Sequence, residues 1–248
     1  MDASNPIIFY DIASGPPVIP YAPNPWKTRY ALNFKGVHYQ TVWVELPDVA
    51  SVRNKLGVAP VRAHKDGSSF YTLPIIKDPS TGDIIGDSFE IALYLDRTYT
   101  NAPLLFPPST IGLQAAFNVQ VDAIFTRFVI LCAHGLPFNS ETAEQSKAAF
   151  LWRAGKTDWE DMTVRGDERA KTLEAFKEAL GELAKFYRCE DGPFLEGKNA
   201  SYADLIVGGW LAFMKVTLKL KEWEGLRTWH DGRWGKLHLA LEKYAEVK

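Results

Sequence analysis

The sequence has few cysteines, almost no charge imbalance and no long apolar run. Cys132 and Cys189 form no spacing typical of a metal or redox site, which favours a reducing compartment. The net charge of -2 gives no reason to expect nucleic acid or an anionic membrane as a partner. The start, MDASNPIIFYDI, has no basic segment and no cleavage site, and no later run approaches membrane-spanning length. We therefore predict a cytoplasmic protein with no metal site and no nucleic-acid or membrane partner.

The residues that are present describe a globular chain rich in aromatic rings. With 248 residues the chain is long enough for two small domains. Its content of 46% hydrophobic and 23% charged residues is close to the globular average. The chain has 8 Trp, 10 Tyr and 14 Phe. Most of these rings belong in the core, but the supply also suits a pocket for flat apolar ligands.

The first hundred residues or so carry the pattern of a compact α/β domain. Turn-rich residues at 78–83 predict that the two strands on either side form an antiparallel hairpin. We expect no regular structure in the polar stretch 47–69. The predicted elements are a strand at 7–12, a helix at 24–35, a strand at 40–46, strands at 73–76 and 84–85, and a helix from 88.

The second half changes character after a stretch with three prolines at 101–109, which is the natural linker. Apolar residues then recur at helical steps from Leu113 to Leu131 and from Leu173 to Tyr187, and the segment 205–216 is strongly apolar. No strand pattern follows the linker. We predict an all-helical C-terminal half.

The segment YAPNPWKTRYALNFKG, residues 21–36, predicts a helix that starts close to the first strand. Asn24 suits the N-cap, Pro25 the first helical position, and Gly36 a left-handed stop. The positive end of such a helix points at whatever binds there. An ordinary capped helix is the alternative interpretation.

The segment Thr72-Leu73-Pro74-Ile75 begins a strand with a proline, which cannot donate to the ladder. A cis bond before Pro74 would leave the backbone N–H and C=O of Leu73 facing outward, ready to pair with an extended peptide. A trans proline on an edge strand is the alternative, and the sequence leaves both open.

Asp87 and Ser88 stand where the next helix begins, and Asp87 precedes Glu90 by three residues as in a capping box. The free N–H groups of such a turn bind a carboxylate, with the Ser88 hydroxyl in addition, and Asp87 can take an α-ammonium beside it. Simple N-capping is the alternative interpretation, and it is favoured for the pair in isolation.

Taken together, these three features describe a site for a small peptide with an α-amino-acid end, a central backbone and a thiol near a positive helix end. Glutathione has this chemistry. The chain resembles the cytosolic glutathione transferases over essentially its whole length. The resemblance implies a thioredoxin-like α/β N-terminal domain at 1–100, a linker at 101–111 and an all-helical bundle domain at 112–248.

Three motifs carry this resemblance. LPII at 73–76 resembles the family's cis-proline strand, Asp87-Ser88 its acidic-Ser γ-glutamyl motif, and SYAD at 201–204 its buried N-capping box. PNPWKTRYALNFKG, YTLPIIKDPSTG and the run DS-x-x-IA-x-YLD resemble the fungal FuA class, which is itself similar to bacterial β-aryl etherases. That class implies a homodimer that handles aromatic compounds related to wood and lignin, either by glutathione chemistry, as in detoxification, or by non-catalytic binding.

The resemblance also implies roles for individual residues. The loop before the LPII strand supplies Arg62, His64 and Lys65 as candidates for glutathione's glycine carboxylate, and a solvated loop is the alternative that is favoured for any one of them. Cys132 and Cys189 are not expected to act as nucleophiles. The site residues that we predict are Tyr21 and Asn24 as catalytic groups; Trp26, Arg62, His64, Thr72, Leu73, Pro74, Asp87 and Ser88 for glutathione; and Phe117, Phe125 and Phe128 for a hydrophobic substrate.

One position departs from the family pattern. The residue before the Pro-Asn-Pro segment is commonly Cys or Ser in the family, but here it is Ala22, which has no hydrogen to donate. A hydrogen bond to a charged acceptor contributes about 1.5–3 kcal/mol, so its loss corresponds to about one or two pKa units of thiolate stabilisation.

Three hypotheses follow from this departure. The first is a weakened transferase that uses glutathione as co-substrate to conjugate or cleave aromatic electrophiles or to reduce hydroperoxides. The second is a non-catalytic ligandin that binds glutathione and phenolic or flavonoid-like compounds, and the third is a regulatory relative without glutathione affinity. Thiol transfer is excluded because it needs a cysteine at position 22.

Overall fold

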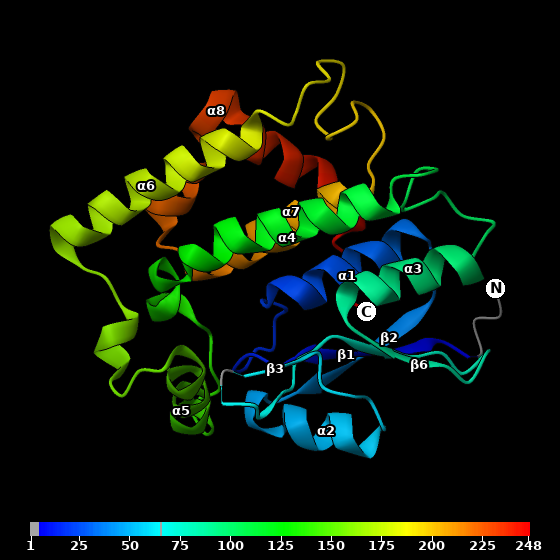
Figure 1. The fold of residues 1–248 in the computed structure, drawn as a ribbon, viewed down its shortest axis with the longest axis horizontal. Helices are drawn as coiled ribbons and strands as arrows, with labels where there is room; N and C mark the ends of the chain where they lie inside the picture. The colour runs from blue at the N-terminus through cyan, green and yellow to red at the C-terminus, as the bar shows by residue number, and fades with distance from the viewer. Residues whose placement is uncertain (1–4, 65) are drawn as a thin grey trace.

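The computed structural model describes residues 5–64 and 66–248, and Lys65 lies outside the described residues. The N-terminal part contains both strands and helices (Figure 1). In chain order, its elements are β1 (Ile7–Ile12), α1 (Pro23–Phe34), β2 (Tyr39–Val44), α2 (Val49–Lys55), β3 (Arg62–Ala63), β4 (Ser69–Phe70), β5 (Ile75–Lys77), β6 (Ile84–Gly86) and α3 (Ser88–Thr98).

Four of these strands form one mixed sheet in the order β2-β1-β5-β6. β1 runs parallel to β2, with Phe9 opposite Thr41, and antiparallel to β5, with Phe9 opposite Ile76. Helices α1 and α3 cover one face of the sheet and α2 lies on the other (Figure 1). The short strands β3 and β4 form a separate hairpin.

Most of the N-terminal prediction is confirmed, including the antiparallel pairing of β5 with β6 across the turn-rich segment. The expectation of no regular structure at 47–69 is wrong, because α2 and the β3–β4 hairpin lie there. Val49 and Arg53 are four residues apart on α2, and both side chains are buried. Because Arg53 occupies the buried face of this short helix, the sequence does not show the regularly spaced apolar residues that predict an amphipathic helix.

The C-terminal half is helical from Ile111 onward, as predicted. Helix α8 is interrupted by a kink at Trp229–Gly232, where His230 and Asp231 have positive φ angles of 53° and 59°. The helices are α4 (Ile111–Arg127), α5 (Ala143–Ala154), α6 (Gly166–Ala184), α7 (Tyr202–Thr217) and α8 (Leu220–Leu241).

Helix α7 lies in the centre of the bundle and is buried on nearly all sides, as its apolar sequence requires. The buried Asp204 carboxylate accepts hydrogen bonds from the N–H groups of Leu195 at 2.7 Å and Ser201 at 2.9 Å. The predicted structural role of the SYAD segment is therefore confirmed. Helix α7 also packs along α1, which joins the bundle to the sheet domain.

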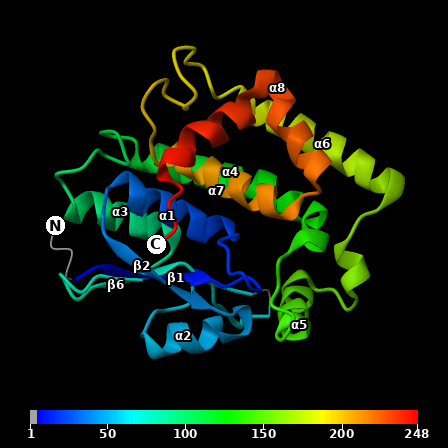
Figure 2. The ribbon, with the colours of Figure 1, turned by 180° about the vertical axis from the view of Figure 1, so that it is seen from behind.

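The last residues of the chain return to the sheet domain, as the red segment in Figure 2 shows. The Thr41 N–H on the edge strand β2 donates to the Lys248 carbonyl at 3.0 Å. Asn33 and Tyr39 donate to the Glu246 carbonyl, each at 2.8 Å. These contacts cover part of the sheet edge and tie the two halves together a second time.

Candidate functional site

Helix α1 begins at Pro23, with Ala22 as its N-cap in an extended conformation and without a side-chain cap. The prediction that Asn24 is the N-cap is therefore wrong. The Trp26 N–H donates to the Ala22 carbonyl at 3.1 Å and closes the first turn. The helix starts earlier than predicted because the fixed φ of Pro23 suits the first helical position and favours an extended residue before it.

This start leaves the hydrogen-bond donors of Asn24 free. Pro23 and Pro25 carry no N–H, and Trp26 uses its own within the helix. Within residues 5–64 and 66–248, neither the backbone N–H nor the side-chain amide of Asn24 has a hydrogen-bond partner. A half-buried amide with unused donors at a helix N-terminus is suited to bind a negatively charged atom.

The peptide bond between Leu73 and Pro74 is cis, which decides the question that the sequence left open. The Leu73 side chain is buried against Val44, Leu46 and Val49, but its backbone N–H and C=O have no hydrogen-bond partner in the described part of the chain. This backbone is therefore free to pair with an extended peptide.

Arg53 holds the strand that leads to this bond. Its guanidinium donates to the Thr72 carbonyl at 2.6 Å and to the Ala59 carbonyl. Burial lowers the pKa of Arg53, while the negative charge of Asp87 opposes that shift. The buried face of α2 thus fixes the chain just before Leu73.

A cavity of about 220 Å³ lies between the start of α1, the Leu73 backbone and the bundle. It brings together five of the predicted site residues, namely Tyr21, Asn24, Arg62, Thr72 and Leu73. Ala22 lines it as well. Most of the remaining lining is apolar and comes from both halves of the chain: Ile12, Pro23, Pro25, Leu46, Val49, Phe70, Tyr71, Val129, Leu136, Phe150, Trp210 and Phe213.

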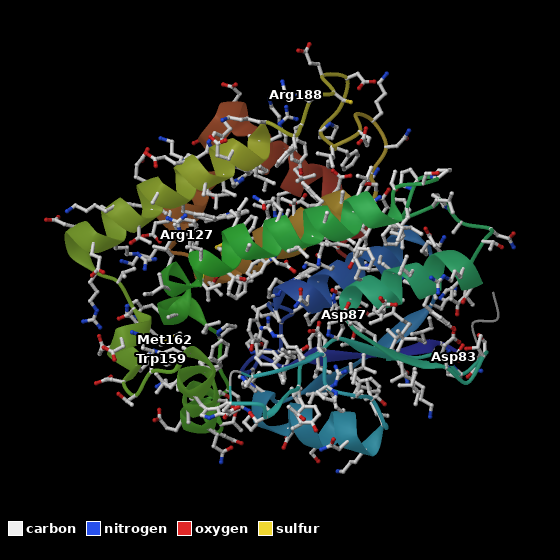
Figure 3. The ribbon with its side chains drawn as sticks, viewed as in Figure 1. Asp83, Asp87, Arg127, Trp159, Met162 and Arg188 are labelled. Atoms are coloured by element: carbon white, nitrogen blue, oxygen red, sulfur yellow. The ribbon has the colours of Figure 1, made fainter. Side chains whose placement is uncertain are left out.

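Asp87 lies at the N-terminal end of α3 (Figure 3), where its Oδ1 accepts hydrogen bonds from the N–H groups of Phe89 at 2.8 Å and Glu90 at 3.4 Å. The predicted N-capping by Asp87 is confirmed. Its backbone φ is 84°, which is uncommon for a residue other than glycine. Oδ2 accepts no hydrogen bond from any residue that the structure describes, and the Ser88 side chain beside it is buried.

Several predicted residues lie away from this cavity. The Trp26 indole N–H donates to the Pro20 carbonyl at 3.2 Å, and its ring packs on Tyr30. The His64 ring packs against Trp152 and Phe70 and lines a neighbouring hollow of about 470 Å³. Pro74 is buried beside Leu73. Predicted contacts of these residues with a ligand stay predictions.

The three predicted phenylalanines of the bundle do not line the 220 Å³ cavity. Phe125 is fully buried, stacked on Trp210 and packed against Phe176, and Phe128 is buried against Phe176 as well. Phe117 lines a separate hollow of about 640 Å³ beside Phe186. The aromatic residues that the bundle contributes to the cavity are instead Phe150 on α5 and Trp210 and Phe213 on α7.

From the C-terminal half, the lining residues that the sequence did not single out are Val129, Leu136, Phe150, Trp210 and Phe213. Trp210 and Phe213 belong to the apolar run 205–216, in which every position except Lys215 is apolar or small, so periodicity cannot indicate which side chain faces a cavity. Phe150 lies on α5, whose amphipathic pattern is weak.

Neither cysteine lines the 220 Å³ cavity. Cys132 is fully buried with its Sγ 3.3 Å from the Met214 Sδ, and burial raises the pKa of its thiol to about 12. Among the residues that the structure describes, no group of three or more His, Cys, Asp or Glu side chains could hold a metal ion. In the same residues, none of the helices has the length and apolarity needed to cross a membrane.

Comparison with known proteins agrees with this geometry. The profile described as "Glutathione S-transferase, N-terminal domain" matches residues 21–98, and "Glutathione S-transferase, C-terminal domain" matches residues 112–244. A glutathione S-transferase-like protein of Aspergillus flavus, ustS, is 30% identical over 231 residues, which cover 84% of this chain and 80% of that protein.

Two solved fungal structures are similar over 98% of this chain and 99% of theirs. A glutathione S-transferase of Ceriporiopsis subvermispora in complex with glutathione is 40% identical with a TM-score of 0.90, and the transferase GSTFuA2 of Phanerochaete chrysosporium is 30% identical with a TM-score of 0.87. The predicted resemblance to the fungal FuA class is confirmed. The chain belongs to the glutathione S-transferase family.

Proposed function

We propose that this protein binds glutathione in the 220 Å³ cavity and joins its sulfur to an aromatic or phenolic electrophile, by conjugation or by displacement of a leaving group. Reduction of a hydroperoxide belongs to the same proposal: the thiolate takes the outer peroxide oxygen and the alcohol leaves, and a second glutathione thiol then displaces water from the sulfenic acid to give glutathione disulfide. The observation that carries it is the pair of unused donors on Asn24, which face a cavity with a free Leu73 backbone and an apolar wall.

Each part of the glutathione molecule has its own binding group on the protein. The cysteinyl backbone pairs with the N–H and C=O of Leu73, as a strand adds to a sheet edge. The γ-glutamyl ammonium binds the unused Oδ2 of Asp87, and the γ-glutamyl carboxylate binds the N–H and hydroxyl of Ser88 at the positive end of α3, because the N–H groups of Phe89 and Glu90 already donate to the Asp87 Oδ1. Arg62, which is exposed at the cavity rim, attracts the glycine carboxylate, with His64 and Lys65 as further candidates.

The chemistry needs a thiolate and a held electrophile, and no covalent bond to the enzyme. The thiol proton leaves to solvent, and the sulfur anion is stabilised by the Asn24 backbone N–H and carboxamide in place of the missing hydroxyl at position 22. Tyr21 lines the same cavity and supplies a phenol near the sulfur. The sulfur then attacks the electrophilic carbon, while the apolar wall holds the ring.

A titration of glutathione that follows thiolate absorbance at neutral pH tests this proposal. We expect a saturable thiolate signal in the wild-type protein and, in Asn24→Ala, a pKa of the bound thiol higher by about one unit, because a charge-assisted hydrogen bond is lost. Asn54→Ala, on the exposed face of α2, is the matched control and should behave like wild type. A full thiolate signal in Asn24→Ala contradicts the role of Asn24.

Ala22 favours a second candidate function, a ligandin that keeps glutathione and phenolic compounds bound without transforming them. Saturable glutathione binding without a thiolate signal supports this function, together with displacement of a fluorescent apolar dye by flavonoid-like phenols. No glutathione binding at all supports the regulatory alternative. By the same resemblance we propose a cytoplasmic homodimer, which sedimentation of the purified protein tests.

A further inference from the structure

Trp210 is the largest ring in the cavity wall, and its orientation is fixed from three sides. Its indole N–H donates to the Asp122 Oδ1 at 2.6 Å. One face stacks on Phe125, with 5.3 Å between ring centroids and 13° between planes, and Phe213 packs edge-on at 5.9 Å. Rotation of the indole about its side-chain bonds would break the hydrogen bond and the stack together.

Asp122 is held in turn by a buried lysine from the other half of the chain. The Lys27 Nζ lies 2.7 Å from the same Oδ1 of Asp122 and donates to the Asn118 Oδ1 at 3.0 Å. The Lys27 side chain is completely buried, whereas that of Asp122 is about one-third exposed. Burial lowers the pKa of Lys27, and the charge of Asp122 opposes that shift.

The network therefore joins three helices around the cavity. Lys27 is one helical turn after Pro23 on α1, Asp122 lies on α4, and Trp210 lies on α7. Hydrogen bonds that involve a charged group are shorter and stronger than neutral ones. The Asp122 carboxylate can therefore bind the Lys27 ammonium and the Trp210 indole N–H at the same time. The start of α1 and the Trp210 ring are thus set relative to each other by one carboxylate.

We propose that Asp122 is a positioning residue that sets the Trp210 indole as a flat wall of the cavity and thereby gives the site its preference for planar aromatic ligands. This inference rests on the proposed function only in taking the cavity as the ligand site. Asp122 itself does not line the cavity, so it acts through Trp210.

Binding of 1-naphthol in the absence of glutathione, measured by isothermal titration calorimetry, tests the proposal. Asp122→Ala should weaken 1-naphthol binding by about tenfold, because a buried indole N–H loses its partner and the ring its orientation. Glutathione affinity should stay within about twofold, because the groups proposed to hold the peptide, namely the Leu73 backbone, Asp87 and Ser88, make no hydrogen bond to Asp122, whose partners are Lys27 and Trp210.

Two matched variants separate the effect of Trp210 from that of the ion pair. Asp122→Asn keeps an oxygen for the indole N–H but removes the charge opposite Lys27, and Asn118→Ala removes the other Lys27 partner alone. Both should bind 1-naphthol within about twofold of wild type. If either binds as weakly as Asp122→Ala, the ion pair and not the indole contact controls the site, and the proposal is overturned.

A spectroscopic measurement reports the ring directly. In protein labelled with 5-fluorotryptophan, the Trp210 resonance, identified by its absence in Trp210→Phe, should move in Asp122→Ala and stay in Asp122→Asn. If Asp122→Ala does not fold, Trp210→Phe replaces it in the test. This variant removes the indole N–H but leaves the ion pair between Asp122 and Lys27 in place. Wild-type affinity for 1-naphthol in Trp210→Phe or Asp122→Ala, or an unmoved resonance, overturns the proposal.

Glutathione binding and 1-naphthol binding by the wild-type protein test the proposed function and this inference separately. A wild-type protein that binds 1-naphthol but no glutathione overturns the proposed function and leaves this inference standing. A protein that binds glutathione but not 1-naphthol overturns the inference alone.

Discussion

Gly209 on α7 lies against the first turn of α1, and a Cβ at this position would be 2.5 Å from the Pro23 carbonyl oxygen. It would also be 2.9 Å from the Lys27 Cγ. The absence of a side chain at Gly209 therefore sets how closely the buried helix of the bundle approaches the helix end that carries Ala22 and Asn24. Trp210, the next residue, is brought to the cavity wall by the same approach.

We expect Gly209→Ala to lower the free energy of unfolding by about 1–3 kcal/mol, because the backbone contact cannot yield without moving α7. Urea denaturation measures the loss. Gly112→Ala on α4 is the control, since a Cβ there meets nothing within 4 Å, and it should be neutral or stabilising by about 0.5–1 kcal/mol. Equal stability of Gly209→Ala and wild type would show that the two helices separate easily.

Ala22→Ser should restore a hydroxyl donor at the cavity and lower the pKa of bound glutathione by about one unit. Turnover with an aromatic electrophile should rise, and the thiolate titration should shift to lower pH by the same amount. Ala170→Ser, on an exposed face of α6, controls for a general effect of the added hydroxyl. Unchanged turnover and titration would mean that residue 22 is not next to the sulfur.

We expect the stability of the protein to depend on pH because of the buried His238 side chain. Its ring is buried against Trp223, both ring nitrogens lack a partner among the described residues, and burial with the charge of Lys215 lowers its pKa from 6.5 to about 4. The unfolded chain binds a proton below pH 6.5, while the folded protein does not until about pH 4. Stability is therefore lost as the pH falls through this window.

The difference between wild type and His238→Leu isolates this effect. Relative to the variant, wild type should lose about 2–3 kcal/mol of unfolding free energy between pH 7 and pH 4. Burial raises the pKa of Asp11 and of Asp204 to about 6, and these two groups act with the opposite sign. Both remain in the variant, so their contribution cancels in the difference. Parallel stability curves of the two proteins would contradict the prediction.

Asp204→Ala should destabilise the fold by about 2–4 kcal/mol, because the buried N–H groups of Leu195 and Ser201 lose their acceptor at the start of α7. Chemical denaturation measures this loss. Asp167→Ala, in the first turn of α6 and exposed, removes only a favourable interaction with the helix dipole and should cost less than about 1 kcal/mol. If Asp204→Ala and Asp167→Ala lose similar free energies of unfolding, then burial of the Asp204 carboxylate does not increase its contribution to stability.

Much of the site could be predicted because its signals are local in the sequence. The proline at 74, the acidic-Ser pair at 87–88 and the SYAD segment each constrain their own backbone through a missing N–H or a short side chain. Ala22 could be recognised as a departure only against the pattern of the family that the chain resembles. The start of α1 was misplaced by two residues because both prolines of Pro-Asn-Pro satisfy the same local rule.

By itself, the sequence determined the two-part architecture, the family and the absence of a hydroxyl at position 22, since these depend on residue type and spacing along one segment. Only the tertiary structure decided that the Leu73–Pro74 bond is cis, that Asn24 keeps its donors unused, and that Trp210 rather than Phe125 lines the cavity. These outcomes depend on contacts between segments far apart in the chain, such as Asp122 with Lys27 and Trp210. No periodicity within one helix specifies which of its apolar side chains meets a cavity formed with another domain.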